Sequence, residues 1–96
     1  MKPSESLRSH RDAILAIALR NGVKNVRVFG SVVHGRDRDG SDLDLLVDAP
    51  RGTTLLDMVR IQHAIEAQIG LPVDVLTAAD LPPLFREQVL LEAQPL

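Results

Sequence analysis

The sequence predicts an α/β fold, a small mixed β-sheet flanked by helices. Three short segments rich in Val and Leu, at residues 26–29, 42–47 and 73–76, have the length and composition of strands. They alternate with longer segments in which apolar residues recur every three to four positions, the period of an amphipathic helix. Strands that alternate with helices are typical of a sheet with helices packed on it, and the expected order is α-β-α-β-α-β-α.

The first half of the chain begins with a predicted helix over residues 5–21. Gly22 ends it, because glycine readily takes the left-handed conformation of a C′ residue. The strand at 26–29 follows and stops at Gly30-Ser31. We expect a short helix over about residues 31–35, and then a polar loop bounded by glycines up to the next strand.

The second half contains the strand at 42–47 and a predicted helix over residues 55–69. Thr54 and Asp57 form a capping pattern at the start of this helix, and Gly70 closes it. The strand at 73–76 comes next. A last helix is expected to begin near Leu81 or Pro82, with a proline in its first turn.

Length and composition predict one domain over residues 1–96. The chain has no cysteine, so disulfides and thiolate metal sites are excluded. Because no apolar run approaches the roughly 20 residues of a membrane span and no signal peptide is recognisable, we expect a cytoplasmic protein with no membrane partner. The net charge of −2 and only two aromatic residues, Phe29 and Phe85, argue against direct nucleic-acid binding.

Three acids occupy strand positions where acids are unexpected. Asp42 and Asp44 are two residues apart, so their side chains point to the same face, with Cα atoms roughly 6.6 Å apart. Leu43 and Leu45 then point into the core. Asp74 lies within a third apolar strand, where an unpaired carboxylate is costly to bury.

These acids predict a metal site beside a phosphate site. Three carboxylates on neighbouring strands repel one another unless a cation lies between them, and Mg²⁺ prefers such oxygen ligands. Two metal ions about 3.5–4 Å apart activate an attacking hydroxyl and neutralise a leaving pyrophosphate. Gly30-Ser31, between a strand and a turn, offers backbone N–H groups and a hydroxyl to an anion. Glycine also lets phosphate approach the backbone closely.

Each residue also has a purely structural interpretation. Asp-x-Asp at a strand end and Gly-Ser after a strand are common, and Asp74 could cap a turn or pair with an arginine. We expect His34 to be packed or exposed to solvent rather than catalytic. Arg36, Arg38 and Arg51 are interpreted as solvated loop charges, any of which could contact phosphate. The functional interpretation depends on the combination and its spacing.

That combination resembles the DNA polymerase beta superfamily of nucleotidyltransferases. Its signature is Gly-Ser, ten residues, Asp-x-Asp and a third Asp on a later strand; here these are Gly30-Ser31, Asp42-Leu43-Asp44 and Asp74. Over almost the whole chain, the sequence is similar to the minimal nucleotidyltransferases, the MntA-like antitoxins encoded beside HEPN-domain toxins. The sequence departs from the family pattern at one position: His34 stands where the family often has arginine.

The resemblance implies roles for these residues. Asp42 and Asp44 would bind two Mg²⁺ ions, and Asp74 would bind one of them and help to deprotonate the acceptor. Gly30 and Ser31 would hold the β- and γ-phosphates of ATP. The implied reaction is transfer of AMP from ATP to a tyrosine of a partner HEPN toxin, which silences it.

Two alternatives remain open from the sequence. One is a nucleotidyltransferase that acts on a small molecule such as an aminoglycoside, although no substrate domain is apparent. The other is a nonenzymatic module that binds the toxin and merely retains the acids. Loss of the acids distinguishes the second alternative, because a passive binder should tolerate it.

Overall fold

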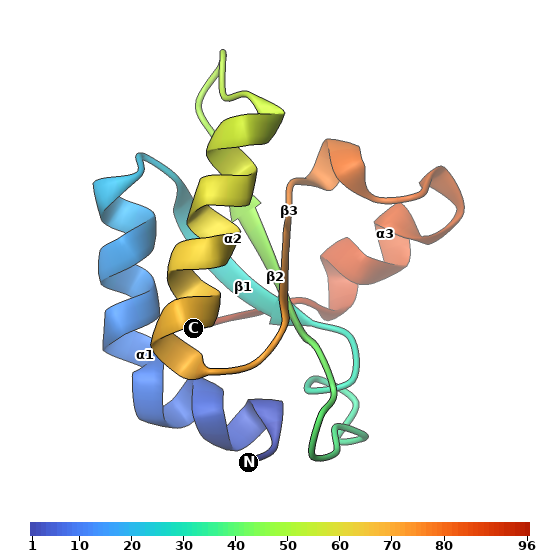
Figure 1. The fold of residues 1–96 in the computed structure, drawn as a ribbon. Coiled ribbons are helices and arrows are strands. Elements are labelled where there is room, and N and C mark those ends of the chain that lie inside the picture. The colour runs from blue at the N-terminus through green and yellow to red at the C-terminus, as the bar shows by residue number, and fades with distance from the viewer.

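The computed structural model describes all residues from 1 to 96. Along the chain its elements are α1 (Pro3–Arg20), β1 (Lys24–Phe29), β2 (Leu43–Asp48), α2 (Leu55–Ile69), β3 (Val73–Leu76), the short 3₁₀ helix η1 (Ala78–Asp80), α3 (Pro83–Glu92) and β4 (Gln94–Pro95). Figure 1 shows their arrangement. No helix is long and apolar enough to span a membrane.

The strands form one mixed sheet in the order β3-β2-β1-β4. β2 and β3 are parallel, and the other two pairs are antiparallel. Parallel neighbours need a crossover connection, which α2 supplies. The predicted class, a small mixed sheet with helices packed on it, is therefore confirmed.

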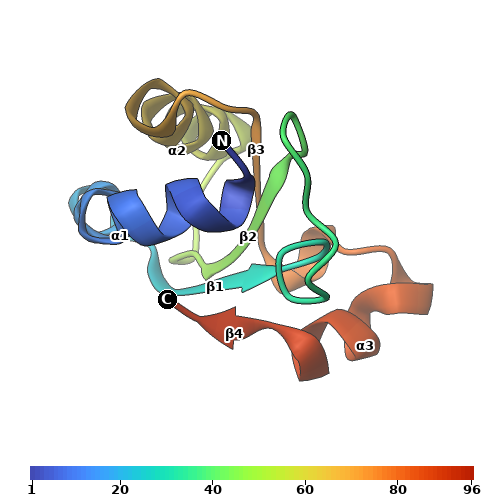
Figure 2. The same cartoon turned by 90° about the horizontal axis from the view of Figure 1, so that it is seen from below.

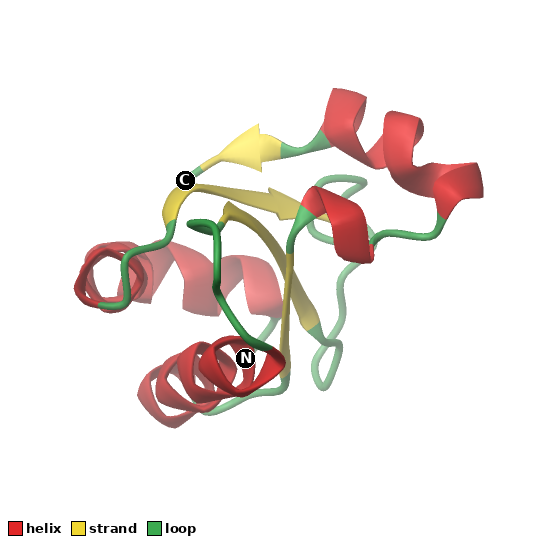
Figure 3. Ribbon diagram, turned by 90° about the horizontal axis from the view of Figure 1, so that it is seen from above, coloured by secondary structure: helices red, strands yellow, loops and turns green.

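The main core lies between the sheet and the pair α1 and α2. Figures 2 and 3 show both helices on one side of the sheet and α3 on the other. Because side chains alternate along a strand, every second residue points to this pair. These buried strand residues are Val26, Val28, Leu43, Leu45, Val47, Val73 and Val75. The residues between them belong to the opposite face, which we call the open face.

The predicted helix ends are mostly confirmed. The amide of Asp57 donates to Thr54 Oγ1 at 3.2 Å, and the Thr54 amide donates to Asp57 Oδ2 at 2.9 Å, so α2 has the expected capping box. Gly22 and Gly70, with φ of 76° and 75°, follow α1 and α2 as predicted. α3 begins at Pro83, so a proline does occupy its first turn.

The expected helix over residues 31–35 is wrong. The segment forms hydrogen-bonded turns, with the His34 amide donating to the Gly30 carbonyl at 3.3 Å. Gly30 and Gly35 have φ of 77° and 67°, and these left-handed residues stop a helix from propagating at either end. β2 begins one residue later than predicted, at Leu43, and η1 and β4 were not predicted.

Candidate active site

Asp44 and Asp74 are neighbours on the open face. They are register partners in the parallel pair of β2 and β3, and Phe29 lies opposite Asp44 on its other side, in β1. Both acids stand between residues that are buried against α1 and α2, so their side chains point away from the main core. Asp74 is exposed and Asp44 is half-buried.

Asp42 completes the acidic group. It immediately precedes β2 and is exposed, and its two-residue spacing from Asp44 puts it on the same face. Burial, followed by the negative charges of Asp74 and Asp42, raises the pKa of Asp44 to about 6. None of the three acids forms an ion pair with a basic residue. The negative charge of this group is therefore uncompensated within the protein.

The chemistry of these donors suits a hard divalent cation. Carboxylate oxygens are the ligands that Mg²⁺ prefers, and a cation would relieve the repulsion that raises the Asp44 pKa. No group of three acidic or histidine side chains is arranged as a metal cluster in this structure.

Gly30 adjoins this group from β1. A Cβ atom at this position would collide with the carboxylate of Asp44, and the φ of 77° disfavours any residue with a side chain. From the sequence we interpreted Gly30 as a position where phosphate approaches the backbone closely. The structure adds another reason, since the space above Gly30 is taken by an acid of the site itself.

The turn after Gly30 leaves backbone donors free. The amides of residues 34, 35 and 36 donate back to carbonyls within the turn, but those of residues 31, 32 and 33 donate to no backbone carbonyl. Ser31 is partly exposed at the start of this run. Successive free amides in a turn can donate to an anion, so the phosphate position expected at Gly30-Ser31 stays a prediction.

A contact that the sequence did not reveal links this turn to α3. His34 Nε2 and Glu92 Oε2 are 2.8 Å apart, although 58 residues separate them. Hydrogen bonds from Gln88 and His34 lower the pKa of Glu92. His34 is exposed, one of the two environments expected for it, and its ring nitrogen is also engaged in this pair. No local motif signals such a contact, because it depends on how α3 returns to the open face.

Asp37 is a second residue that the sequence did not single out. It is only 9% exposed, and its Oδ2 accepts a hydrogen bond from the Ser4 amide at 2.9 Å. Hydrogen bonds from Ser4 lower the pKa of Asp37. Asp37 therefore caps the first turn of α1 from a distant loop, and it anchors the segment between Ser31 and Asp42.

The three loop arginines separate into two places. Arg36 and Arg38 lie in the loop between Ser31 and Asp42, whereas Arg51 follows the other end of β2. That end is about 13 Å from Asp44, at the usual rise per strand residue. All three are exposed, and none forms an ion pair, as expected for solvated charges. Arg51 is thus at the wrong end of the strand to contact a phosphate near Ser31.

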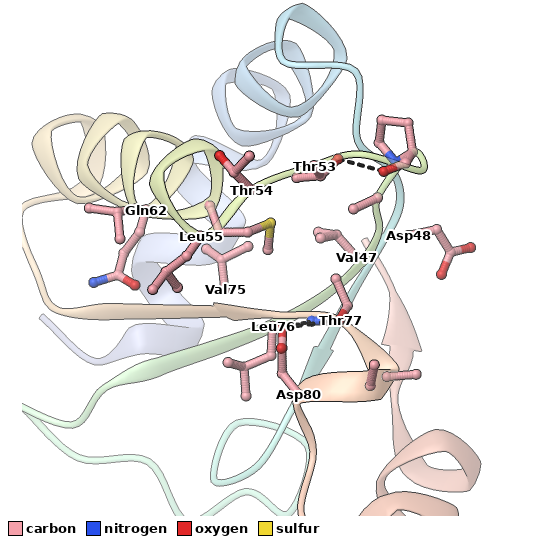
Figure 4. A pocket seen from close by; sticks show the side chains of 16 residues that line it. Val47, Asp48, Thr53, Thr54, Leu55, Gln62, Val75, Leu76, Thr77 and Asp80 are labelled. Carbon is pink, nitrogen blue, oxygen red and sulfur yellow. Dashed lines mark hydrogen bonds between the residues drawn. The ribbon is translucent and has the colours of Figure 1, made fainter.

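The largest cavity also lies at that far end, between α2 and η1 (Figure 4). Its volume is about 830 Å³, and none of the predicted site residues lines it. Its acids already have partners: Asp48 pairs with Arg27 at 2.8 Å, and Asp80 accepts hydrogen bonds from Thr77 at 3.0 Å. Asp42, Asp44 and Asp74, which have no basic partner, lie at the opposite end of the sheet.

Comparison with known proteins defines the class to which this fold and acidic site belong. Residues 7–96 match the family model described as the nucleotidyltransferase domain. Because the match covers nearly the whole chain, the chain belongs to this family and is a nucleotidyltransferase.

Among curated relatives, a protein of Methanocaldococcus jannaschii, provisionally named a protein adenylyltransferase, is 40% identical over 80 residues, 83% of this chain and 86% of its own. The protein adenylyltransferase MntA of Thermococcus cleftensis is 37% identical over 73 residues, 76% of this chain and 74% of its own.

Solved structures share the fold. One described provisionally as a minimal nucleotidyltransferase has a TM-score of 0.84 and 49% identity, over 97% of this chain and 95% of that one. A toxin-antitoxin solved with AMP-PNP has a TM-score of 0.76 at 17% identity, over 88% of this chain and 69% of that one. The second likeness shows the fold alone.

Proposed function

We propose that this chain is a Mg²⁺-dependent protein adenylyltransferase that moves AMP from ATP to a tyrosine of a HEPN-domain toxin and so acts as its antitoxin. The observation that carries the proposal is the juxtaposition of Asp44 and Asp74 on the open face, beside the Gly30-Ser31 turn. The names of the two curated relatives support protein adenylylation, and the toxin-antitoxin with AMP-PNP has the same fold.

Asp42, Asp44 and Asp74 would hold the metal ions, the first two acids binding both and Asp74 binding one. Mg²⁺ at this place would supply charge stabilisation to the triphosphate and make the acceptor hydroxyl more acidic. The carboxylates bind metal ions strongly only when the carboxylates are ionised. Because the pKa of Asp44 is raised, protons compete with metal ions for this residue near pH 6.

The Gly30-Ser31 turn would bind the β- and γ-phosphates. The free amides of residues 31 to 33 and the Ser31 hydroxyl would donate to the triphosphate, and Gly30 in the same turn adjoins Asp44. Because these donors belong to a short turn fixed by its own hydrogen bonds, little reorganisation is needed when the nucleotide binds.

The chemical step is a displacement at the α-phosphorus. The tyrosine oxygen of the acceptor forms a bond to this phosphorus, and the bond to the oxygen that bridges the α- and β-phosphates breaks. Pyrophosphate leaves with that bonding pair of electrons, and the proton of the hydroxyl passes to the carboxylate of Asp74. Asp74 is the exposed member of the acidic pair, which suits a base that must meet an incoming protein.

Co-expression with a HEPN-domain toxin, the acceptor that the proposal names, tests the proposal. The toxin should become heavier by the mass of AMP, with the group on a tyrosine. The variant Asp42→Ala/Asp44→Ala should fold but leave the toxin unmodified and active, because the metal ligands are gone. The matched control Asp12→Ala/Asp39→Ala removes two exposed acids elsewhere and should modify the toxin normally.

Other results would favour the alternatives. If the Asp42→Ala/Asp44→Ala variant neutralised the toxin as well as the wild type does, with no AMP on either toxin sample, the chain would be a nonenzymatic binding antitoxin. Transfer of AMP to an aminoglycoside, with none to the toxin, would make it a small-molecule enzyme instead.

A further inference from the structure

α3 carries much of the exposed apolar surface of this protein. None of its residues is buried, and the exposed fractions of Leu84, Phe85 and Leu91 are 89%, 61% and 77%. A single exposed leucine is ordinary, but several large apolar side chains exposed on one short helix are typical of an interaction site. Figure 3 shows α3 on the side of the sheet opposite α1 and α2, where few elements cover it.

The patch is hollowed along one side of the helix. A depression of about 340 Å³ is lined by Pro83, Arg86, Glu87, Leu90 and Leu91. Their spacing of three and four residues places them along one stripe of the helix. The guanidinium of Arg86 already donates to backbone carbonyls next to the helix, but Glu87 is exposed and forms no ion pair. The hollow is therefore apolar with one uncompensated negative charge.

One end of α3 is tied to the turn beside the acidic site. Near its start, Arg86 donates to the carbonyl of Ala78 at 2.9 Å, in η1, which lies at the far end of β3 from Asp74. At its end, Glu92 contacts His34 at 2.8 Å, within the turn that contains Ser31. A protein bound to α3 would therefore lie next to the open face on which Asp44 and Asp74 stand.

We propose that the apolar patch of α3, formed by Leu84, Phe85, Leu90 and Leu91, is the docking surface for the acceptor protein. The occupant is expected to present an apolar surface with a Lys or Arg opposite Glu87. This inference rests on the proposed function, because transfer to a protein requires the acceptor to be held beside the acids. Docking on α3 meets that requirement, since the helix borders the open face and carries the charge that orients the partner.

The variant Leu84→Lys/Leu91→Lys tests the surface. Both side chains are exposed, so the fold should be kept, and the control Leu19→Lys/Leu55→Lys changes leucines that are 80% and 81% exposed on α1 and α2. A purified HEPN-domain toxin is the probe. The patch variant should raise both the Kd for toxin and its KM in AMP transfer by about tenfold or more. The control variant should match the wild type, and binding of AMP-PNP with Mg²⁺ should be unchanged in both.

Glu87→Lys tests the charge separately. It should weaken toxin binding less than the patch variant does, and it should reduce the loss of affinity that salt causes in the wild type. An unchanged salt dependence would remove the basic residue from the proposed partner surface.

The outcomes separate this inference from the proposed function. AMP transfer with the same KM in the patch variant and the wild type would overturn the docking surface and leave the enzyme intact. If the wild type binds the toxin but adds no AMP to it, and the patch variant no longer binds the toxin, the proposed AMP transfer is wrong and the docking surface is kept. If the wild type is a dimer that the patch variant converts to a monomer with unchanged toxin affinity, a second copy covers α3 and the inference is wrong. A wild type that does not bind the toxin overturns both.

Discussion

At the scale of single residues, Asp44 is a destabilising group in the metal-free protein. Its pKa is about 6 in the folded chain, whereas an unfolded Asp titrates near 3.9. The folded state therefore holds the proton more tightly, and the stability that the protonated acid contributes is lost as pH rises from about 4 to 6. Retaining this acid despite its cost agrees with a role in binding a cation.

Asp44→Asn should therefore raise the stability of the metal-free protein at pH 7. The gain should be about 1 kcal/mol, less than the full shift would give because the side chain is half-exposed. It should vanish below pH 4, where both proteins are neutral at this position. Urea unfolding with EDTA at pH 4 and pH 7 measures it, with Asp12→Asn as the exposed control. A stability loss at pH 7 would instead assign Asp44 a structural role.

Gly30→Ala should destabilise the protein by about 2–3 kcal/mol, because it combines a left-handed backbone with a collision against Asp44. Gly35→Ala is the matched control in the same turn, with φ of 67° and open space around the added methyl, so it should cost only about 1 kcal/mol. Combining Asp44→Ala with Gly30→Ala should restore part of the lost stability, because the collision is removed. Combining it with Gly35→Ala should restore none. Equal losses in the two single variants would show that the collision is relieved at no cost.

At the scale of elements, the contact between His34 and Glu92 joins the turn after β1 to the end of α3. Both side chains are substantially exposed, at 44% and 32%, so the pair should contribute less than about 1 kcal/mol to stability. Its expected importance is positional, because the same turn presents Ser31 and the free amides.

His34→Ala should raise the KM for ATP by about threefold to tenfold and change kcat much less, if the pair holds the turn in its phosphate-binding shape. Glu92→Ala should have the same effect, and the double variant should be no worse than either single one. Steady-state AMP transfer to the toxin gives both constants. Additive effects in the double variant would show that the two side chains act independently.

At the scale of the whole molecule, metal and nucleotide should stabilise the fold together. Mg²⁺ and AMP-PNP added jointly should raise the melting temperature by more than the sum of their separate effects, because each compensates charge that the other leaves exposed. The synergy should be weaker at pH 5 than at pH 7.5, since Asp44 is then largely protonated. Additive shifts at pH 7.5 would argue against a shared site.

The open face is covered unevenly, because Leu46 on it is fully buried whereas Asp74 is exposed. α1 and α2 bury one face of the sheet, whereas the opposite face is bordered by α3 and the loop between Ser31 and Asp42 (Figure 2). Asp74 is therefore accessible to a partner protein, and the largest cavity lies at the other end of the strands.

The sequence by itself determined the alternation of strands and helices, because apolar periodicity and caps such as Thr54 with Asp57 act over a few residues. It also determined that Asp42, Asp44 and Gly30-Ser31 would lie close together, since their strands are consecutive. The helix expected at residues 31–35 failed because glycines with left-handed backbones bracket it, and single residues decide such short segments.

Only the tertiary structure decided which residues meet across long stretches of chain. The register that pairs Asp44 with Asp74 depends on how α2 crosses over, and the collision that reserves Gly30 for glycine depends on the Asp44 rotamer. Asp37 contacts Ser4 of α1 across 33 residues of sequence, and Glu92 contacts His34 across 58. β4 pairs with β1 only because α3 returns the chain to that strand. Such contacts depend on the packing of whole elements, so local periodicity carries no record of them.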